Sequence, residues 1–227
     1  MCFSAGASFA AAGMLSVIGG AAVYSTRQNK KLLPTAASPL FFGVQQACEG
    51  LVWLTLMSGE TTNSLHWFST YAFLFFASAW WPIWIPWALY HAEHKYNRKK
   101  LLWITTLMGS IAGVLLFISW PLQTTGVEVI NHHLNYPVNN YPFGITDPLL
   151  SQIILWCISL LYCTATITPL FISSIPYMWV VGTAIMAGLL VSYVFYFTAL
   201  PSVWCFFAAV SSLLLFGVIK NYNKNVR

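Results

Sequence analysis

Seven long apolar stretches constrain the fold of this chain more than any other feature of its sequence. A helix needs about 20 apolar residues to cross a hydrocarbon core of about 30 Å. The stretches do not alternate apolar and polar residues, as the strands of a transmembrane barrel do. We therefore predict an all-α integral membrane bundle of seven transmembrane helices, in one domain over residues 1–227. The predicted helices cover about residues 2–24, 34–58, 66–90, 101–120, 148–171, 174–197 and 201–220.

The shortage of charge excludes the soluble classes of protein. Only 7% of the residues are charged and 58% are hydrophobic, whereas about a quarter of the residues of a soluble domain are charged. A chain of 227 residues has too little interior to hide so much apolar surface from water. A soluble enzyme, a disordered chain and a secreted disulfide scaffold are therefore excluded.

The basic residues predict the orientation in the membrane. All ten occur in three groups, which an odd number of spans places on one side. Positive charge gathers on the cytoplasmic side, so we predict an outside N-terminus and a cytoplasmic C-terminus in the plasma (bacterial inner) membrane. Because topology explains the net charge of +5, the expected partners are membrane lipids and a small or lipid-like ligand, and not nucleic acid. The groups are Arg27, Lys30 and Lys31; Lys95, Arg98, Lys99 and Lys100; and Lys220, Lys224 and Arg227.

Glu49 is the one acidic residue inside a predicted span, about halfway along the second helix. A carboxyl group at that depth needs a proton, a partner, a metal ion or a wet cavity. Gln45 and Gln46 lie four and three residues before it, on the same helix face. Lipid cannot satisfy these polar groups, so we predict that this face points into the bundle. It forms either a functional pocket or a hydrogen-bonded helix contact.

Further candidate residues gather on the predicted outer side. Cys2 begins the first helix and Cys205 lies about one turn into the last, so both have a similar depth. The outer loop 121–147 is long, and it carries His132 and His133, of which we expect one to serve a given site. Cysteine, histidine and carboxylate groups are ligands of zinc, copper or iron. Ordinary packing, a Cys2–Cys205 disulfide and solvated histidines are the alternatives.

Tryptophan, proline and small residues suggest how the helices pack. Trp80, Trp81, Trp84 and Trp87 are interpreted as membrane anchors, as in the aromatic belts of membrane proteins. Pro82 should kink the third helix and leave carbonyl groups for its neighbours to satisfy. Small residues mark closely packed helices; they are Gly6, Ala10, Gly13, Ala184 and Gly188.

Three sequence runs resemble a bacterial family of small multi-helix membrane proteins of unknown function. They are Met1-Cys2-Phe3-Ser4-Ala5, Gln45-Gln46-Ala47-Cys48-Glu49-Gly50-Leu51-Val52-Trp53 and Ser202-Val203-Trp204-Cys205-Phe206-Phe207-Ala208-Ala209. The resemblance extends over nearly the whole chain and implies a shared seven-helix fold. It also implies that Cys2, Glu49, His133 and Cys205 are signature positions. It implies no activity.

These residues lead to three hypotheses for function. The first is a metal-dependent hydrolase of a lipid-like amide or ester, with one transition metal ion held by Cys2, Cys205 and His132 or His133 and with Glu49 as general base or ligand. The second is a protein that binds or transports a small solute or metal. The third is a structural protein in which a disulfide joins the first helix to the last.

Overall fold

The computed structural model describes residues 4–119, 126–130, 132–136 and 142–225. In this part of the chain seven helices are long and apolar enough to cross a membrane, which confirms the predicted seven-helix membrane bundle. The chain is therefore a multi-pass membrane protein. Which side each end faces stays a prediction. The spans are α1 (Ala5–Thr26), α2 (Leu33–Met57), α3 to α4 (Ser64–Ala92), α5 (Tyr96–Ser119), α6 (Pro148–Ile172), α7 (Met178–Phe195) and α8 (Leu200–Asn225).

The third span is built from three segments: α3 (Ser64–Phe75), a π-helical turn η1 (Phe76–Trp80) and α4 (Trp81–Ala92). The turn ends at Trp80, two residues before Pro82, which has no N–H for the preceding turn. The Ala77 carbonyl there accepts a hydrogen bond of 2.6 Å from the Tyr162 hydroxyl of α6. This confirms the expectation that a neighbouring helix satisfies carbonyl groups near the proline.

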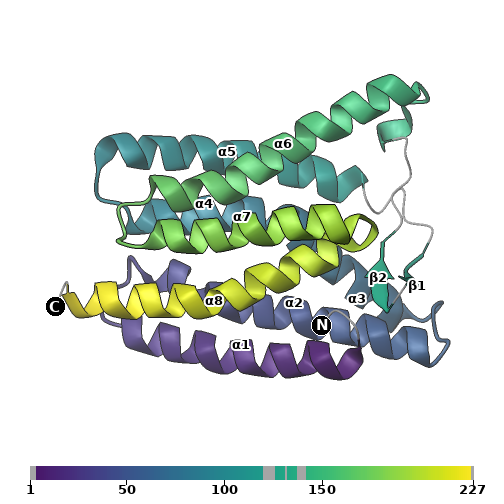
Figure 1. The fold of residues 1–227 in the computed structure, drawn as a ribbon, viewed down its shortest axis with the longest axis horizontal. Coiled ribbons are helices and arrows are strands. Elements are labelled where there is room, and N and C mark those ends of the chain that lie inside the picture. The colour runs from purple at the N-terminus through teal and green to yellow at the C-terminus, as the bar shows by residue number, and fades with distance from the viewer. Residues whose placement is uncertain (1–3, 120–125, 131, 137–141, 226–227) are drawn as a thin grey trace.

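The spans lie side by side along the long axis of the molecule (Figure 1). α1 packs against α2 and α8, α5 packs against α4 and α6, and α7 packs against α8. The first and last spans are therefore neighbours. This brings the first turns of α1 and α8 to the same end of the bundle (Figure 1).

A small β-hairpin adds to the predicted all-α fold. Strands β1 (Glu128–Ile130) and β2 (His133–Asn135) pair antiparallel, within the segment predicted as a long outer loop. Two 3₁₀ turns, η2 (Pro142–Gly144) and η3 (Phe197–Ala199), precede α6 and α8. We call the end of the bundle that carries the strands the hairpin end, and the opposite end, where the chain finishes, the C-terminal end (Figure 1).

The hairpin is packed onto the bundle. Leu134 is fully buried, and the Tyr136 ring stacks on Phe73 of α3 with 4.9 Å between ring centroids. Leu134 and Tyr136 belong to one apolar cluster with Val52 of α2 and Cys205 of α8. Since burial of such side chains stabilises by about 1.5–3 kcal/mol each, the hairpin forms a fixed cover over this end.

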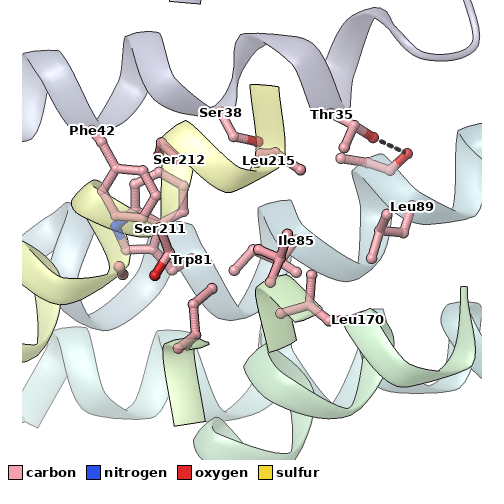
Figure 2. A pocket seen from close by; sticks show the side chains of 14 residues that line it. Thr35, Ser38, Phe42, Trp81, Ile85, Leu89, Leu170, Ser211, Ser212 and Leu215 are labelled. Carbon is pink, nitrogen blue, oxygen red and sulfur yellow. Dashed lines mark hydrogen bonds between the residues drawn. The ribbon is translucent and has the colours of Figure 1, made fainter. Parts of the chain in front are cut away.

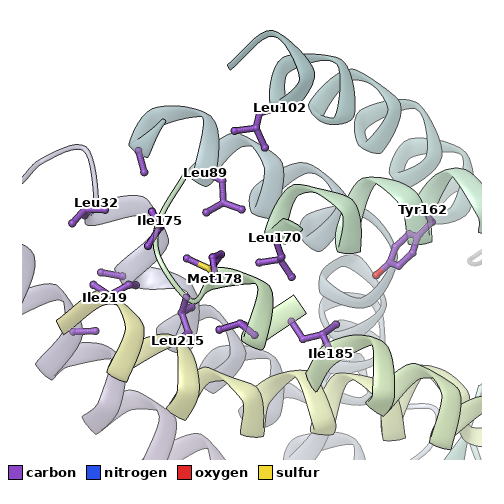
Figure 3. Close-up of a cluster of buried hydrophobic side chains, with 14 of the residues drawn as sticks. Leu32, Leu89, Leu102, Tyr162, Leu170, Ile175, Met178, Ile185, Leu215 and Ile219 are labelled. Carbon is purple, nitrogen blue, oxygen red and sulfur yellow. The ribbon is translucent and has the colours of Figure 1, made fainter. Parts of the chain in front are cut away.

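A larger apolar core extends through the C-terminal half of the bundle. Its side chains come mostly from α4, α5, α6, α7 and α8, with others from α1, α2 and the loops that join α1 to α2 and α6 to α7 (Figure 3). Met178 at the start of α7 is fully buried at its centre. Core residues that Figure 3 labels are Leu32, Leu89, Leu102, Tyr162, Leu170, Ile175, Met178, Ile185, Leu215 and Ile219.

The predicted small-residue contacts were right in α7 and wrong in α1. A Cβ on Gly188 would lie 2.6 Å from Phe207, so α7 and α8 are in close contact there. Gly6 and Gly13 are exposed, and a Cβ on either would meet no atom within 4 Å. α1 instead packs through Gly19, whose added Cβ would lie 2.6 Å from Leu40. A small residue in the sequence therefore does not show whether its side of the helix packs against another helix or faces lipid.

Glu93 joins two loops at the C-terminal end. One of its carboxyl oxygens accepts the backbone N–H groups of His94 and Lys95 at 2.9 Å, and the other accepts that of Ser174 at 2.8 Å. Arg98 donates to the Ser173 carbonyl at 3.1 Å. These contacts tie the loop between α4 and α5 to the loop between α6 and α7.

Glu93→Gln should reduce stability by about 1–3 kcal/mol at neutral pH, because one charged acceptor of two backbone N–H groups becomes an amide. Burial alone would raise the pKa of Glu93, but its hydrogen bonds outweigh this and lower the pKa below the usual value. The stabilisation is therefore fully present above the ordinary pKa of glutamate. It is lost as the pH falls through the lowered pKa of Glu93. Thermal unfolding of both proteins against pH tests this. Equal melting temperatures at neutral pH would contradict it.

Candidate functional site

Five buried polar side chains meet inside the hairpin half of the bundle. We call this group the polar centre: Gln45, Gln46 and Glu49 of α2 with Ser202 and Cys205 of α8. Gln45, Glu49 and Ser202 have no exposed surface, Gln46 has 1% and Cys205 has 5%. The polar face of the second helix thus points into the bundle, as its sequence predicted.

Glu49 holds the two helices of the polar centre together. The Ser202 hydroxyl donates to Glu49 Oε1, and Gln46 Nε2 donates to Oε2 at 3.3 Å. Ser202 lies in the first turn of α8, which begins at Leu200. The N-terminus of a helix carries a partial positive charge that favours a carboxylate. The fold therefore places this carboxyl where the helix dipole and two donors offset part of the cost of burial.

Gln45 connects the polar centre to the third span. Its Oε1 accepts a hydrogen bond of 2.7 Å from the Trp81 indole N–H, and its side chain adjoins the Cys205 thiol. Trp81 is 3% exposed. Its interpretation as a membrane anchor was therefore wrong, because the π-helical turn rotates α4 so that this indole faces α2 and not lipid.

The two loop histidines have different environments. His132 is exposed and has a left-handed backbone with φ 63°, whereas His133 is half-buried on β2. The His133 ring packs edge-on against Tyr196 with 5.0 Å between centroids. Burial, and next the charge of neighbouring groups such as His132, lowers the pKa of His133. A neutral imidazole at neutral pH is able to bind a metal or accept a proton.

The predicted metal ligands are brought together only in part. Cys205 adjoins Glu49 in the polar centre, and His133 lies on the hairpin that covers the same end. Cys2 lies outside the described residues. Within the described residues no three histidine, cysteine or acidic side chains gather as a metal site requires. The polar centre thus supplies one carboxyl group and one thiol, two of the four ligands that zinc usually takes.

The thiol of Cys205 is free, as are those of Cys48, Cys157 and Cys163. The described part of the chain therefore offers no support for a disulfide at Cys205. In a membrane bundle of this kind the packing of α1 against α8 holds the first and last spans together without it.

A small cavity, lined mostly by apolar side chains, lies on the other side of Trp81. It has a free volume of about 30 Å³ and lies between α2, α4, α6, α7 and α8 (Figure 2). This volume is enough for one ordered water molecule. We call this space the inner cavity. Phe42 and Trp81 close it toward the polar centre, their rings stacked with 3.6 Å between centroids. Four hydroxyl groups line it, from Thr35, Ser38, Ser211 and Ser212.

The hydroxyls of the inner cavity are not all used by the protein. Thr35 donates to the Ala88 carbonyl at 3.3 Å, and Ser38 accepts from the Trp84 indole at 3.1 Å. Ser211 donates to the Phe207 carbonyl at 2.9 Å. Ser212 Oγ is buried and has no hydrogen-bond partner in the described part of the chain. Such a group is normally satisfied by water or by a ligand.

The model of a family of unknown function, DUF6629, matches residues 1–227. The chain belongs to this family. No curated protein and no solved structure matches this chain.

Two residues of the site in this DUF6629 protein were not assigned by sequence reasoning. Ser202 lies three residues before Cys205, which places both near the start of α8. Only the contact between α2 and α8 gives it the role of donor to Glu49. Trp81 carried no signal, because three similar tryptophans surround it in the sequence.

Proposed function

We propose that the protein is a transport protein of the plasma (bacterial inner) membrane, which binds a small solute or metal ion at the polar centre and passes it toward the inner cavity. The hairpin end faces outward in this proposal, and the C-terminal end faces the cytoplasm. The charge distribution supports this orientation, because all ten basic residues lie in or beside the first and third loops or within residues 220–227.

The position of Trp81 is the observation that carries the proposal. Its indole N–H donates to Gln45 in the polar centre, while its ring stacks on Phe42 and lines the inner cavity. One side chain thus separates the polar centre from the inner cavity, which follows it along the bundle. Trp81 also comes directly after the π-helical turn. Interrupted helices at membrane depth often form the binding sites of transporters, and π-helical turns often mark functional sites.

The chemistry of the polar centre suits a cation or a hydrogen-bonding solute. It combines a carboxyl group, a thiol and two amides in a dry interior, and oxygen and sulfur donors together favour transition metals. Gln46 Oε1 is buried and has no hydrogen-bond partner within the described residues. An acceptor of this kind is available to a ligand that enters between α2 and α8.

The metal-dependent hydrolase is supported less well. A general base must accept a proton from water at hydrogen-bonding distance. The Glu49 oxygens already accept hydrogen bonds from Ser202 and Gln46. Because Glu49 has no exposed surface, a bulky lipid-like substrate would have to part α2 from α8 to reach it. Hydrolysis of a lipid-like substrate stays a prediction that the following experiment also addresses.

Zinc binding by the purified, reduced protein tests the proposal. Glu49→Gln and Cys205→Ser should each weaken Zn²⁺ binding by at least about tenfold, because each removes a ligand and not a supporting residue. In liposomes that enclose a zinc indicator, Trp81→Phe should change the rate of zinc uptake far more than the affinity. The phenyl ring keeps the stack with Phe42 but loses the N–H donor to Gln45.

His132 provides the control. His132→Ala should leave zinc affinity unchanged, because this side chain is exposed. The metal form of the proposal is wrong if zinc does not bind, or if both Glu49→Gln and Cys205→Ser bind it like the unmodified protein. Zinc-dependent cleavage of a lipid ester or amide that Glu49→Gln abolishes would favour the hydrolase instead.

A further inference from the structure

A recess opens at the C-terminal end, far from the polar centre. It lies where α4 ends and α5 begins, and its volume is about 250 Å³. Its walls combine aromatic rings with two ammonium groups, and the lining residues are Tyr90, Tyr96, Lys99, Lys100 and Trp103.

In the described part of the chain no acidic side chain pairs with the two lysines of this recess. Lys99 Nζ lies over the Tyr90 ring, 4.7 Å from its centroid, which fixes the ammonium group at the wall. Glu93 is the nearest acidic residue in the sequence. Its carboxyl oxygens accept backbone N–H groups of His94, Lys95 and Ser174. Two positive charges therefore face the recess, and the recess has room for an anion.

An apolar stripe leads from the recess into the membrane. Beyond Trp103, which is 48% exposed, every third or fourth residue of α5 is a large exposed aliphatic side chain. Residues at this spacing share one side of a helix. Half of the hydrocarbon core, about 15 Å, corresponds to about ten residues of helix. The stripe consists of Ile104, Leu107, Ile111, Val114 and Ile118.

We propose that this recess binds the headgroup of an anionic phospholipid, with the acyl chains along the stripe of α5. The phosphate lies between Lys99 and Lys100, and Tyr90, Tyr96 and Trp103 contact the glycerol region. Aromatic and basic residues are common at any membrane interface. Here they form the walls of one recess at the foot of an exposed apolar stripe. A free phosphate compound shares the headgroup chemistry but gains nothing from the stripe.

Native mass spectrometry of the full-length protein tests this proposal. The protein is released from detergent after incubation with equal amounts of phosphatidylglycerol and phosphatidylcholine. The unmodified protein should retain phosphatidylglycerol preferentially. Lys99→Gln/Lys100→Gln should reduce that preference by about 30-fold, from the attraction of two surface lysines to anionic lipid. Lys99→Arg/Lys100→Arg should keep it.

The control is a second pair of adjacent lysines. Lys30 and Lys31 are exposed in the loop between α1 and α2 and do not line the recess. Lys30→Gln/Lys31→Gln should retain phosphatidylglycerol like the unmodified protein. An equal loss in both double variants would mean that general charge attracts the lipid, and would overturn the proposal. Displacement of phosphatidylglycerol by millimolar inorganic phosphate would assign the recess to a free phosphate compound and also overturn it.

Discussion

Gly109→Ala is expected to lower the free energy of unfolding by about 3 kcal/mol, near the upper range for overpacking a closely fitted interior. A Cβ at Gly109 of α5 would lie 1.8 Å from the Pro82 carbonyl oxygen of α4 and 2.5 Å from its carbonyl carbon. These are backbone atoms, so no side-chain rotation relieves the overlap. The two helices would have to separate. Unfolding in detergent with increasing dodecyl sulfate measures the change.

The close approach at Gly109 follows from the prolines of the third span. Pro86 has no N–H, so the Pro82 carbonyl lacks its usual helical donor. A glycine allows the backbone of α5 to cover that oxygen at short range. Gly13→Ala is the matched control, since a Cβ there would meet no atom within 4 Å. The explanation fails if both variants unfold at the same dodecyl sulfate fraction.

Glu49→Ala is expected to destabilise the protein by about 3 kcal/mol, from one lost buried side chain and two lost hydrogen bonds. The donors are Ser202 Oγ and Gln46 Nε2, which both point at the carboxyl group. Glu49→Gln should cost much less, because the amide has nearly the same shape and keeps one oxygen acceptor. The difference in stability between these two variants separates the effect of side-chain volume from the effect of charge.

Melting temperatures in one detergent measure both effects. Ser202→Ala removes one of the two donors and should cost about 1 kcal/mol. Glu60→Ala is the control, because this glutamate is exposed at the hairpin end and surface changes usually stay within about 0.5 kcal/mol. A Glu49→Ala protein as stable as Glu60→Ala would show that the polar centre does not hold α2 to α8.

The interior position of Gln45, Gln46 and Glu49 could be predicted because it follows from properties of single residues. Lipid does not satisfy amide or carboxyl groups, so a polar helix face must turn toward the protein. The identity of the partner could not be predicted in the same way. Ser202 is 153 residues from Glu49 in the chain, and serines occur in most of the spans.

The role of Trp81 shows how backbone geometry decides a site. Trp80 is the last residue of the π-helical turn, and Trp81, Trp84 and Trp87 follow it. One extra residue in a turn rotates the following helix by about 100°. Because of this rotation Trp81 is buried against Gln45, while Trp80 and Trp84 stack on each other with 5.0 Å between centroids. The sequence shows the proline that favours a turn of this kind, but not its register.

The sequence by itself determined the number of spans, their approximate ends and the membrane class. Transfer from water to lipid is a sum over single residues along the chain, so these features need no knowledge of neighbours. Only the tertiary structure decided that α1 packs against α8, that a hairpin covers the polar centre, and that Gly109 and not Gly13 lies at a helix crossing. Each of these features depends on the rotation of one helix against another. The fit of side chains and backbone in three dimensions sets that rotation.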